Sequence, residues 1–407
     1  AEILLAKGFQ VQGSDQKLSA NVRRLKDKGV QIYIGHEAKN LQSAKNIILS
    51  SAVKSTNPEL QAARDMGLPI ISRADILSEL MRLYSTVSVT GTHGKTTTTS
   101  LVSTIFEKAN LDPTVITGGI INAWGSNARL GQGKWMIVEA DESDGTFVRL
   151  PTEIGVVTNI DPEHLDYFKT IDEMHKSFEA FYRRIPFYGV AVTCIDHPVV
   201  REMLNKLNLR NDGRRLITYG TSDDADLKLT KWTQKGFVSF FDAHLSKRVR
   251  GGERKLEGWS VPIPGVHNAL NALAALAVAL EAGIADEAAR LALQSFSGVK
   301  RRFQCTGQWN GVSIYDDYGH HPAEISAVLS AAKAGARGRV VAIVEPHRYT
   351  RVRDLFDDFC SCLKNADKVI VAPLYSAGEP KIEGIDHHTL AEGIRSKGHQ
   401  SVNSIDT

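Results

Sequence analysis

The sequence predicts an α/β protein built from three domains, and three observations support this fold class. Its 407 residues exceed what one hydrophobic core usually serves, so the chain should divide into two or three domains. Runs of apolar and β-branched residues alternate with stretches of helical periodicity, which is the pattern of largely parallel sheets covered by helices. The exception lies between Leu216 and Val261, where shorter strand-like runs predict an inserted antiparallel section.

The first domain is predicted over residues 1–84 as a small α/β unit. It opens with the end of a helix closed by Gly8, and a later helix begins at Asn57 with proline in the next position. The predicted strands are Phe9–Asp15, Gln31–Ile34 and Asn46–Leu49. Asp15 ends its strand, where nucleotide-binding α/β units often hold a ribose or sugar hydroxyl. The same side chain could instead cap the helix near Val22.

The second and third domains are predicted over residues 85–298 and 299–407. The strands expected in the second domain are Thr86–Thr90, Trp135–Val138, Ile154–Thr158 and Gly189–Thr193. An Ala- and Leu-rich helix over Asn268–Ala282 closes at Gly283. The strands expected in the third domain are Val312–Tyr315, Val340–Val344 and Lys368–Ala372. Between the last two, one helix is predicted from the apolar face formed by Val352, Leu355, Phe356, Phe359 and Leu363.

The stretch GTHGKTT, from Gly91 to Thr97, joins a predicted strand to a predicted helix and has the composition of a phosphate-binding loop. Its two glycines allow a tight turn that points backbone N–H groups at an anion, and the start of a helix adds positive potential. Lys95 supplies a point charge, and the Thr96 hydroxyl suits Mg²⁺. The common pattern G-x-x-x-x-G-K-[ST] would place glycine where this chain has Val89. An ordinary glycine-rich turn with a solvated lysine is the alternative.

Acidic residues and a histidine follow two further predicted strands. Glu139 opens a run of acids that continues to Asp144, and its carboxylate is the first choice for a Mg²⁺ ligand beside nucleotide phosphates. The alternative is a solvated acidic loop. Asn159 and His164 follow the next strand and could face the same crevice, where imidazole can join a second divalent ion. A surface or capping role for that histidine stays open.

Three later motifs also place polar side chains after strands or at a helix start. Asn268 is as plausible a helix N-cap as a contact to a nucleobase. The segment from Tyr315 to Pro322 (YDDYGHHP) is dense in acids, aromatic rings and histidines. Arg348 and Arg351 lie three positions apart and can grip a carboxylate with charge-assisted hydrogen bonds. They could instead balance nearby acids such as Asp354.

Composition narrows the function classes. The chain has 49 Lys and Arg against 46 Asp and Glu, with no basic tract, so nucleic acid is not favoured as a partner. No apolar run approaches the length of a membrane span, and the first residues lack a signal pattern. The four cysteines lack zinc-like spacing and favour reduced thiols. We therefore expect a cytoplasmic protein without a nucleic-acid or membrane partner.

Taken together and in order, these motifs resemble those of the Mur ligases. The motifs are GTHGKTT from Gly91, EADESD from Glu139, Thr158-Asn159 with His164-Leu165-Asp166, GVHN from Gly265, DDYGHHP from Asp316 and PHRY from Pro346. The likeness spans nearly the whole chain. It implies three domains: a Rossmann-like N-terminal domain for a UDP-sugar, a central P-loop ATPase domain with a parallel sheet, and a Rossmann-like C-terminal domain for an amino acid.

The resemblance also implies roles for individual residues. The residues expected to hold ATP are Gly91, Thr92, His93, Gly94, Lys95, Thr96, Thr97, Asn268, Asp317, Tyr318 and His320. Those expected to hold Mg²⁺ are Thr96, Glu139 and His164. His347, Arg348 and Arg351 would orient the carboxylate of L-alanine and join Lys95, Glu139 and His164 in catalysis. The contacts expected for UDP-N-acetylmuramate are Asp15, His36, Ser50, Ser51, Thr158 and Asn159.

The implied reaction is ATP-driven joining of L-alanine to UDP-N-acetylmuramate through an acyl phosphate, in the cytoplasmic stage of peptidoglycan synthesis, by a monomer or weak homodimer. A ligase that adds a whole tripeptide to the same sugar nucleotide is the nearest alternative. A non-catalytic nucleotide switch is another. The family's first strand and glycine-rich loop and its last strand and helix are missing, so we expect both ends to be truncated. Lys176 is a candidate for the carbamylated lysine of related ligases.

Overall fold

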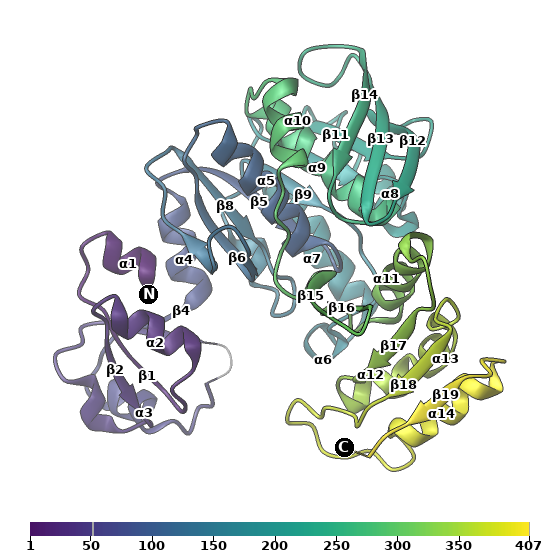
Figure 1. Cartoon of the computed structure of the whole chain (residues 1–407). Helices are drawn as coiled ribbons and strands as arrows, with labels where there is room; N and C mark the ends of the chain where they lie inside the picture. The colour runs from purple at the N-terminus through teal and green to yellow at the C-terminus, as the bar shows by residue number, and fades with distance from the viewer. Residues whose placement is uncertain (51–52, 407) are drawn as a thin grey trace. The chain divides into compact units, whose positions relative to one another are not determined.

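The computed structural model describes residues 1–50 and 53–406. The chain divides into two compact units, one made of residues 1–120 and 124–218 and the other of residues 121–123 and 219–407 (Figure 1). Each candidate motif falls within one of the two units, so the motifs can be described unit by unit. In the described residues, no helix combines the length and apolar character that crossing a membrane requires.

The N-terminal part of the first unit is a small α/β fold, as predicted. Its strands are β1 (Gln12–Asp15), β2 (Gln31–Ile34), β3 (Ile47–Leu49) and β4 (Ile70–Ser72), which form the parallel pairs β1–β2 and β3–β4. Its helices are α1 (Glu2–Ala6), α2 (Ala20–Asp27), α3 (Pro58–Asp65) and α4 (Arg73–Met81), with a 3₁₀ turn over Ala38–Leu41. The Asn57 side chain caps α3 and Pro58 occupies its first position, which confirms the predicted helix start.

The rest of the first unit is built on a largely parallel sheet, which confirms the predicted fold class. Its strands are β5 (Ser85–Thr90), β6 (Thr114–Ile121), β7 (Ser126–Arg129), β8 (Trp135–Glu139), β9 (Ile154–Val157) and β10 (Val190–Cys194). They lie in the order β10-β9-β5-β8-β6-β7, so β5 is central and pairs in parallel with β8 and β9. Most residues of these strands are buried because helices cover parallel sheets on both faces.

Helices and turns connect these strands. They are α5 (Lys95–Lys108), the 3₁₀ turn η2 (Thr146–Arg149), α6 (Leu165–Phe168), α7 (Ile171–Arg184) and α8 (Pro198–Leu207). The loops that leave the carboxyl ends of β5, β8 and β9 carry the first three candidate motifs. Because neighbouring parallel strands end at the same edge of a sheet, this arrangement brings those loops together.

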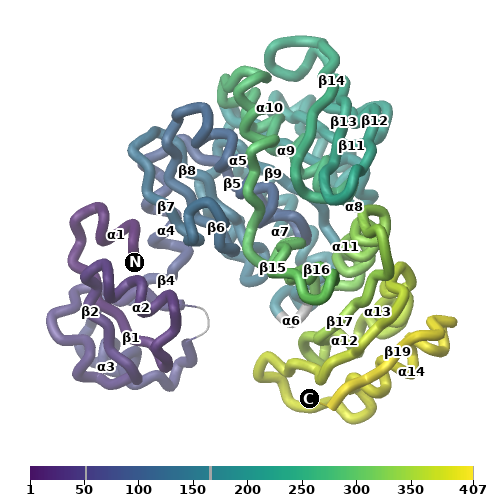
Figure 2. Tube along the Cα trace, in the orientation of Figure 1, coloured from purple at the N-terminus to yellow at the C-terminus, as the bar shows by residue number. Residues whose placement is uncertain are grey.

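The second unit begins with the predicted antiparallel section. After β11 (Arg215–Gly220), the strands β12 (Leu227–Lys235), β13 (Val238–Leu245) and β14 (Arg254–Val261) pair in antiparallel fashion, and their path can be followed in Figure 2. A tight turn at Gly236, with φ +58°, joins β12 to β13. The helices α9 (Val266–Glu281) and α10 (Asp286–Gln294) follow. Nearly all of α9 is buried, which explains its Ala- and Leu-rich sequence.

The C-terminal part of the second unit joins an antiparallel hairpin to a three-stranded parallel sheet. The hairpin is β15 (Gln304–Trp309) with β16 (Val312–Asp316), and the sheet has the order β17-β18-β19. The sheet strands are β17 (Val341–Val344), β18 (Lys368–Val371) and β19 (Val402–Ser404). The helices are α11 (Pro322–Gly335), α12 (Tyr349–Asp354), α13 (Phe356–Cys362) and α14 (His387–Ser396).

One sequence prediction in this part is wrong. The single helix expected between β17 and β18 is two short helices, because Leu355 leaves the helical region at φ −119° and ψ 27°. The apolar face itself survives the break. Val352, Phe359 and Leu363 are buried in one core cluster, and Leu355 packs against it. Periodicity reported the buried face correctly but could not locate a bend within it.

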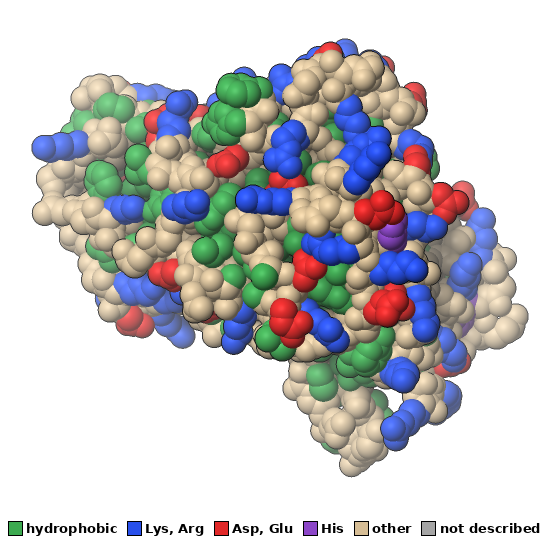
Figure 3. All heavy atoms as spheres, turned by 90° about the horizontal axis from the view of Figure 1, so that it is seen from above, with side chains coloured by type: hydrophobic (Ala, Val, Ile, Leu, Met, Phe, Trp, Pro, Cys, Tyr) green, Lys and Arg blue, Asp and Glu red, His purple; other side chains and the backbone are tan. Residues whose placement is uncertain are grey.

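On the face seen in Figure 3, Lys and Arg side chains are interspersed with Asp and Glu, which matches the nearly balanced composition. A protein that grips a polyanion along its surface usually gathers basic side chains instead.

The aromatic cluster beneath β9 gives a test of the core. Phe178 is fully buried, and its ring centroid lies 5.1 Å from that of Phe147. We expect Phe178→Ala to lower the free energy of unfolding by about 3–5 kcal/mol, because it removes transfer energy and leaves a cavity. Phe187→Ala is the matched control, since Phe187 is 81% exposed and its loss should change stability by under about 0.5 kcal/mol. Equal effects in urea denaturation would contradict this packing.

Candidate functional site

The predicted strand, turn and helix around the GTHGKTT loop are all present. β5 ends at Thr90 and α5 begins at Lys95, with Gly91 at φ +122° and Gly94 at φ +81°. A Cβ atom at Gly91 would lie 2.2 Å from the Thr158 hydroxyl, so a larger residue does not fit. No side chain caps the start of α5. The loop therefore keeps the N–H groups of a helix start available for an anion.

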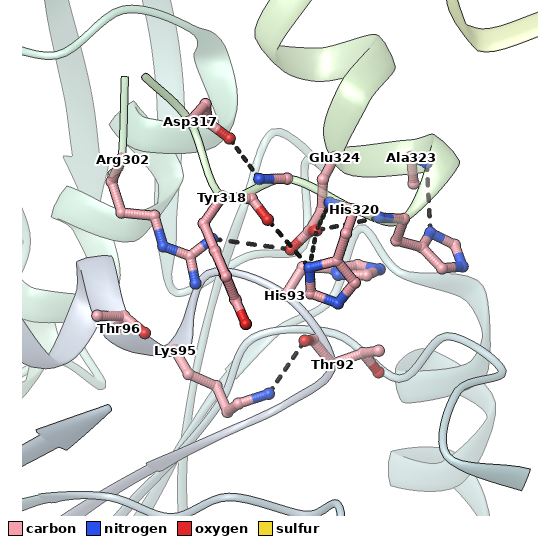
Figure 4. Close-up of polar contacts among 12 residues, drawn as sticks. Thr92, His93, Lys95, Thr96, Arg302, Asp317, Tyr318, His320, Ala323 and Glu324 are labelled. Atoms are coloured by element: carbon pink, nitrogen blue, oxygen red, sulfur yellow. Dashed lines mark hydrogen bonds and ion pairs between the residues drawn. The ribbon is translucent and has the colours of Figure 1, made fainter. Parts of the chain in front are cut away.

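Lys95 is largely buried and faces several oxygen atoms. Its Nζ donates to the carbonyl oxygen of Gly91 at 2.7 Å. It also donates to the carbonyl oxygen of Thr92 at 3.0 Å, as Figure 4 shows. It also lies 2.8–2.9 Å from both carboxylate oxygens of Glu142. Burial lowers the pKa of Lys95, but the charges of Glu142 and Asp141 outweigh burial and raise it. The ammonium group therefore stays charged at neutral pH.

Glu142 is the residue that sequence reasoning missed. It lies in the acidic run that the sequence analysis singled out, yet Glu139 was chosen there because it ends the strand. Glu142 is 1% exposed, and its carboxylate contacts both Lys95 and His164. Among several adjacent acids, only the fold shows which one turns inward.

Glu139 lies next to the first turn of α5. Its Oε1 accepts a hydrogen bond from the Thr96 hydroxyl at 2.8 Å. Its Oε2 accepts from the Thr117 hydroxyl at 2.8 Å and from the Gly118 N–H at 2.6 Å. Thr97 lies in the same first turn of α5 and is half-buried. Two oxygen donors, a hydroxyl and a carboxylate, thus meet beside the loop, and hard oxygen ligands of this kind suit Mg²⁺.

His164 lies against the same acids. Its Nε2 is 3.4 Å from Glu142 Oε1 and 3.8 Å from Glu163 Oε2, and ligand atoms of the three residues all lie within 4.8 Å of one another. Burial lowers the pKa of His164, but its hydrogen bond to Glu142 and the neighbouring carboxylate charges outweigh burial and raise it. This cluster offers one nitrogen and two carboxylate donors to a cation. Lys176, by contrast, is exposed on α7.

Thr158 and Asn159 contact the loop itself. The Thr158 hydroxyl donates to the His93 carbonyl at 2.6 Å. The Asn159 side chain accepts from the His93 N–H at 2.8 Å and donates to the His93 carbonyl at 3.0 Å. Both side chains were predicted to contact the sugar nucleotide. The structure places their polar atoms against the backbone of the glycine-rich loop, and their contact with a sugar nucleotide stays a prediction.

The described candidate residues of the first domain lie at or just after the ends of β1, β2 and β3. Asp15 accepts a hydrogen bond from the Lys17 N–H at 3.1 Å, whereas Ser19 caps α2, so the capping alternative for Asp15 is wrong. His36 Nδ1 lies 3.1 Å from the Ser14 hydroxyl. Ser50 directly follows β3, and Ser51 lies outside the described residues.

In the second unit, Asn268 lies buried in the first turn of α9. Gly265 occupies the N-cap position, so the capping alternative for Asn268 is wrong. Its Nδ2 donates to the Pro264 carbonyl at 2.7 Å, and its Oδ1 accepts from Asn271 at 3.2 Å. The side chain is therefore held in one orientation by the start of its own helix.

The YDDYGHHP segment forms a polar turn between β16 and α11. Asp317 accepts hydrogen bonds from the N–H groups of Phe303 and Gly319, both at 2.7 Å, and burial raises its pKa. The N–H of His320 donates to Glu324 at 3.1 Å, as Figure 4 shows. The ring of Tyr318 is partly exposed, and the guanidinium of Arg301 lies 4.7 Å from its centre.

The PHRY segment follows β17, at the carboxyl edge of the parallel sheet. Arg351 Nη1 lies 3.2 Å from His347 Nδ1, and Arg348 Nη1 lies 4.0 Å from Glu379. Asp354, a partner considered from sequence, pairs with Arg353 at 2.7 Å. Burial and the positive charge of neighbouring Arg351 lower the pKa of His347 to about 4. A neutral imidazole beside two guanidinium groups forms an electropositive site suited to a carboxylate.

Three family models match successive parts of the chain. The model of the Mur ligase family catalytic domain matches residues 1–85, the Mur ligase middle domain matches residues 89–279, and the Mur ligase glutamate ligase domain matches residues 301–407. A UDP-N-acetylmuramate--L-alanine ligase from Methylobacterium radiotolerans is 54% identical over 406 residues, which cover 100% of this chain and 86% of the relative.

Solved structures show the same architecture. A UDP-N-acetylmuramate-alanine ligase from Thermotoga maritima matches with a TM-score of 0.81 and 25% identity, covering 100% of this chain and 87% of the other. A murein peptide ligase from Psychrobacter arcticus matches with a TM-score of 0.71 and 23% identity over the same shares, and shows the fold alone. The family models, the full-length relative and the three-domain architecture agree: this chain belongs to the Mur ligase family.

Proposed function

We propose that this chain joins L-alanine to the lactyl carboxylate of UDP-N-acetylmuramate, with cleavage of ATP to ADP and phosphate. The observation that carries the proposal is the 54% identity, over the full chain, with a relative named as UDP-N-acetylmuramate--L-alanine ligase. The loop at Gly91–Gly94 with its buried Lys95 supports the ATP end of the reaction. The reaction belongs to the cytoplasmic stage of peptidoglycan synthesis, catalysed by a monomer or weak homodimer.

We assign the three parts of the reaction to three domains, residues 1–84, 85–298 and 299–407. The first would bind the UDP-sugar through Asp15, His36, Ser50 and Ser51. In the second, the loop amides and Lys95 would bind the ATP phosphates, with Asn268 against adenine. Asp317, Tyr318 and His320 would complete the nucleotide side. Thr158 and Asn159 would contact the sugar nucleotide while other polar atoms of the same residues hold the loop backbone.

Two groups of residues fit divalent cations. Thr96 and Glu139 offer adjacent oxygen donors to Mg²⁺, and His164 with Glu142 offers a second set. Bound Mg²⁺ would neutralise negative charge on the phosphates. Lys95 contributes a fixed positive charge at the same place, held ready by the carbonyls of Gly91 and Thr92.

In the first chemical step, a lactyl carboxylate oxygen attacks the γ-phosphorus of ATP, and the bond to the β-bridging oxygen breaks. The products are ADP and an acyl phosphate. Two anions must approach each other, so the positive charge of Lys95 stabilises the transition state more than the separated reactants.

In the second step, the neutral amine of L-alanine attacks the acyl carbon. A tetrahedral intermediate forms, then loses phosphate and a proton to give the amide. His347, Arg348 and Arg351 would hold the alanine carboxylate, which leaves the amine free to attack. Holding the nucleophile in place removes much of the entropic cost of a bimolecular step.

Two alternatives have different requirements. A ligase for a whole tripeptide would release phosphate with the tripeptide rather than with L-alanine, and a nucleotide switch would need neither. We expect phosphate release only when ATP, UDP-N-acetylmuramate and L-alanine are all present. Release with the tripeptide in place of alanine would support the first alternative, and release independent of the sugar nucleotide would support the second.

We expect Lys95→Ala to lower alanine-dependent phosphate release by roughly 10² to 10³ or more, because a charge at the developing transition state is lost. The substitution also leaves the buried Glu142 carboxylate with His164 but without its lysine partner, which would destabilise the fold. The double variant Lys95→Ala/Glu142→Gln removes the buried carboxylate charge as well and should recover stability without recovering rate. Near-normal phosphate release by Lys95→Ala would contradict the assignment.

We expect Glu139→Gln to raise the Mg²⁺ concentration needed for half-maximal rate by roughly tenfold or more, because a carboxylate donor becomes a neutral amide. The measurement is phosphate release during a Mg²⁺ titration after treatment with EDTA. Glu173→Gln, on the exposed first turn of α7, is the control and should leave the titration unchanged. Superimposed curves for Glu139→Gln and wild type would exclude Glu139 as a ligand.

We expect Glu142→Gln to lower the free energy of unfolding of the nucleotide-free protein by about 1–3 kcal/mol, because buried Lys95 loses its counter-charge. Saturating ATP should reduce the difference in stability between Glu142→Gln and wild type, because a phosphate of ATP then replaces the Glu142 carboxylate as the partner of Lys95. Glu79→Gln, which breaks the exposed pair with Arg82, should cost under about 1 kcal/mol. A Glu142→Gln defect that ATP leaves unchanged, in thermal melts, would argue against exchange of partners at Lys95.

A further inference from the structure

An acid lies between two histidines beside the glycine-rich loop. Asp161 Oδ2 is 3.2 Å from Nε2 of His93, which belongs to the loop, and its Oδ1 is 3.1 Å from Nε2 of His197. The three side chains are only 13–30% exposed. The carboxylate thus links the loop to a residue outside the motifs of the proposed site.

The backbone of Asp161 holds the same loop. Its N–H donates to the Thr92 hydroxyl at 2.8 Å, and that hydroxyl donates to the Asp161 carbonyl at 3.2 Å. The Thr92 N–H donates to the carbonyl of Asn159 at 3.1 Å. With the contacts of Thr158 and Asn159 to His93, every residue from Thr158 to Asp161 except Ile160 bonds to the loop through a polar atom.

His197 anchors this arrangement to the body of the unit. It lies between β10 and α8, at the N-cap position of α8, yet its side chain makes no capping bond. The ring is turned to Asp161 instead. Because β10 pairs in parallel with β9, the residue that follows β10 lies beside the segment that follows β9. An ordinary capping residue at this position would contact its own helix rather than a neighbouring loop.

We infer that Asp161 and His197 are positioning residues that fix His93, and through it the loop amides, in the geometry that binds ATP phosphates. The inference rests on the proposed ATP-dependent function. Neither residue needs to touch the substrate. A loop held in its binding conformation loses less conformational entropy when the nucleotide arrives, so removing an anchor should weaken nucleotide binding. His197 is the clearest place to test this, because its ring reaches the loop through Asp161 and the residue lies outside the motifs of the proposed site.

The test compares His197→Ala with His197→Gln by calorimetric titration of the full chain with Mg²⁺-ADP, in the absence of the other substrates. We expect His197→Ala to weaken ADP binding about tenfold. His197→Gln keeps an N–H donor that can reach Asp161, so its affinity should lie within about threefold of wild type. The KM values for L-alanine and UDP-N-acetylmuramate should stay within about twofold in both variants. His175→Ala on α7 is the matched histidine control and should leave ADP affinity unchanged.

Asp161 itself provides a second arm. In the double variant Asp161→Asn/His197→Ala, we expect ADP affinity to fall by less than the product of the two single effects. Both substitutions break the same series of contacts from His197 through Asp161 to His93. Three results would overturn the inference: ADP affinity in His197→Ala equal to that in His175→Ala, no rescue by His197→Gln, or additive effects of the two substitutions. If the ADP affinities of all variants are as expected but the wild-type chain does not ligate L-alanine, only the proposed function is refuted. Absence of any ADP binding by the wild-type chain would refute both.

Discussion

A lysine that is largely buried must have a counter-charge. In the proposed reaction, Lys95 must also exchange the carboxylate of Glu142 for a phosphate of ATP when the nucleotide binds. Lys95 lies within 3.0 Å of two loop carbonyls and of the Glu142 carboxylate, which is itself almost fully buried. Burial alone lowers the pKa of Lys95, and the charge of Glu142 is the largest of the effects that raise it. With Glu142, the ammonium is charged and pointed along the loop before any nucleotide arrives. This pair also fixes the position of His164, because the imidazole of His164 contacts the same carboxylate of Glu142.

The segment 158–161, which follows β9, holds the loop that carries Lys95. Gly91 approaches Thr158 so closely that a side chain would not fit, and the segment 158–161 bonds to the loop backbone at several points. The central position of β5 between β8 and β9 makes this possible, since the three strands end at one edge. Glu139 at the end of β8 and Asn159 after β9 therefore reach the same loop from the two strands that flank β5. The topology of the sheet decides which motifs can cooperate.

Much of this could be predicted from the sequence, and the failures have physical reasons. The α/β fold, the antiparallel insertion and the turn between β5 and α5 follow from periodicity and from glycines that only a tight turn requires. Sequence could not show that Glu142, rather than a neighbouring acid, turns inward, because four acids within six residues look alike until the chain is folded. It also could not show that Thr158 and Asn159, which follow a strand as ligand-binding residues do, bond to the backbone of the loop. The break at Leu355 has no glycine or proline to announce it.

The central claim is that this chain activates the lactyl carboxylate as an acyl phosphate before alanine attacks. The direct measurement uses UDP-N-acetylmuramate with both carboxylate oxygens labelled as ¹⁸O, together with ATP and L-alanine, and determines the mass of the released phosphate. The oxygen that bonds to phosphorus leaves with it, so the account predicts one ¹⁸O atom in each phosphate and one in the product amide. Released phosphate without ¹⁸O would contradict the account.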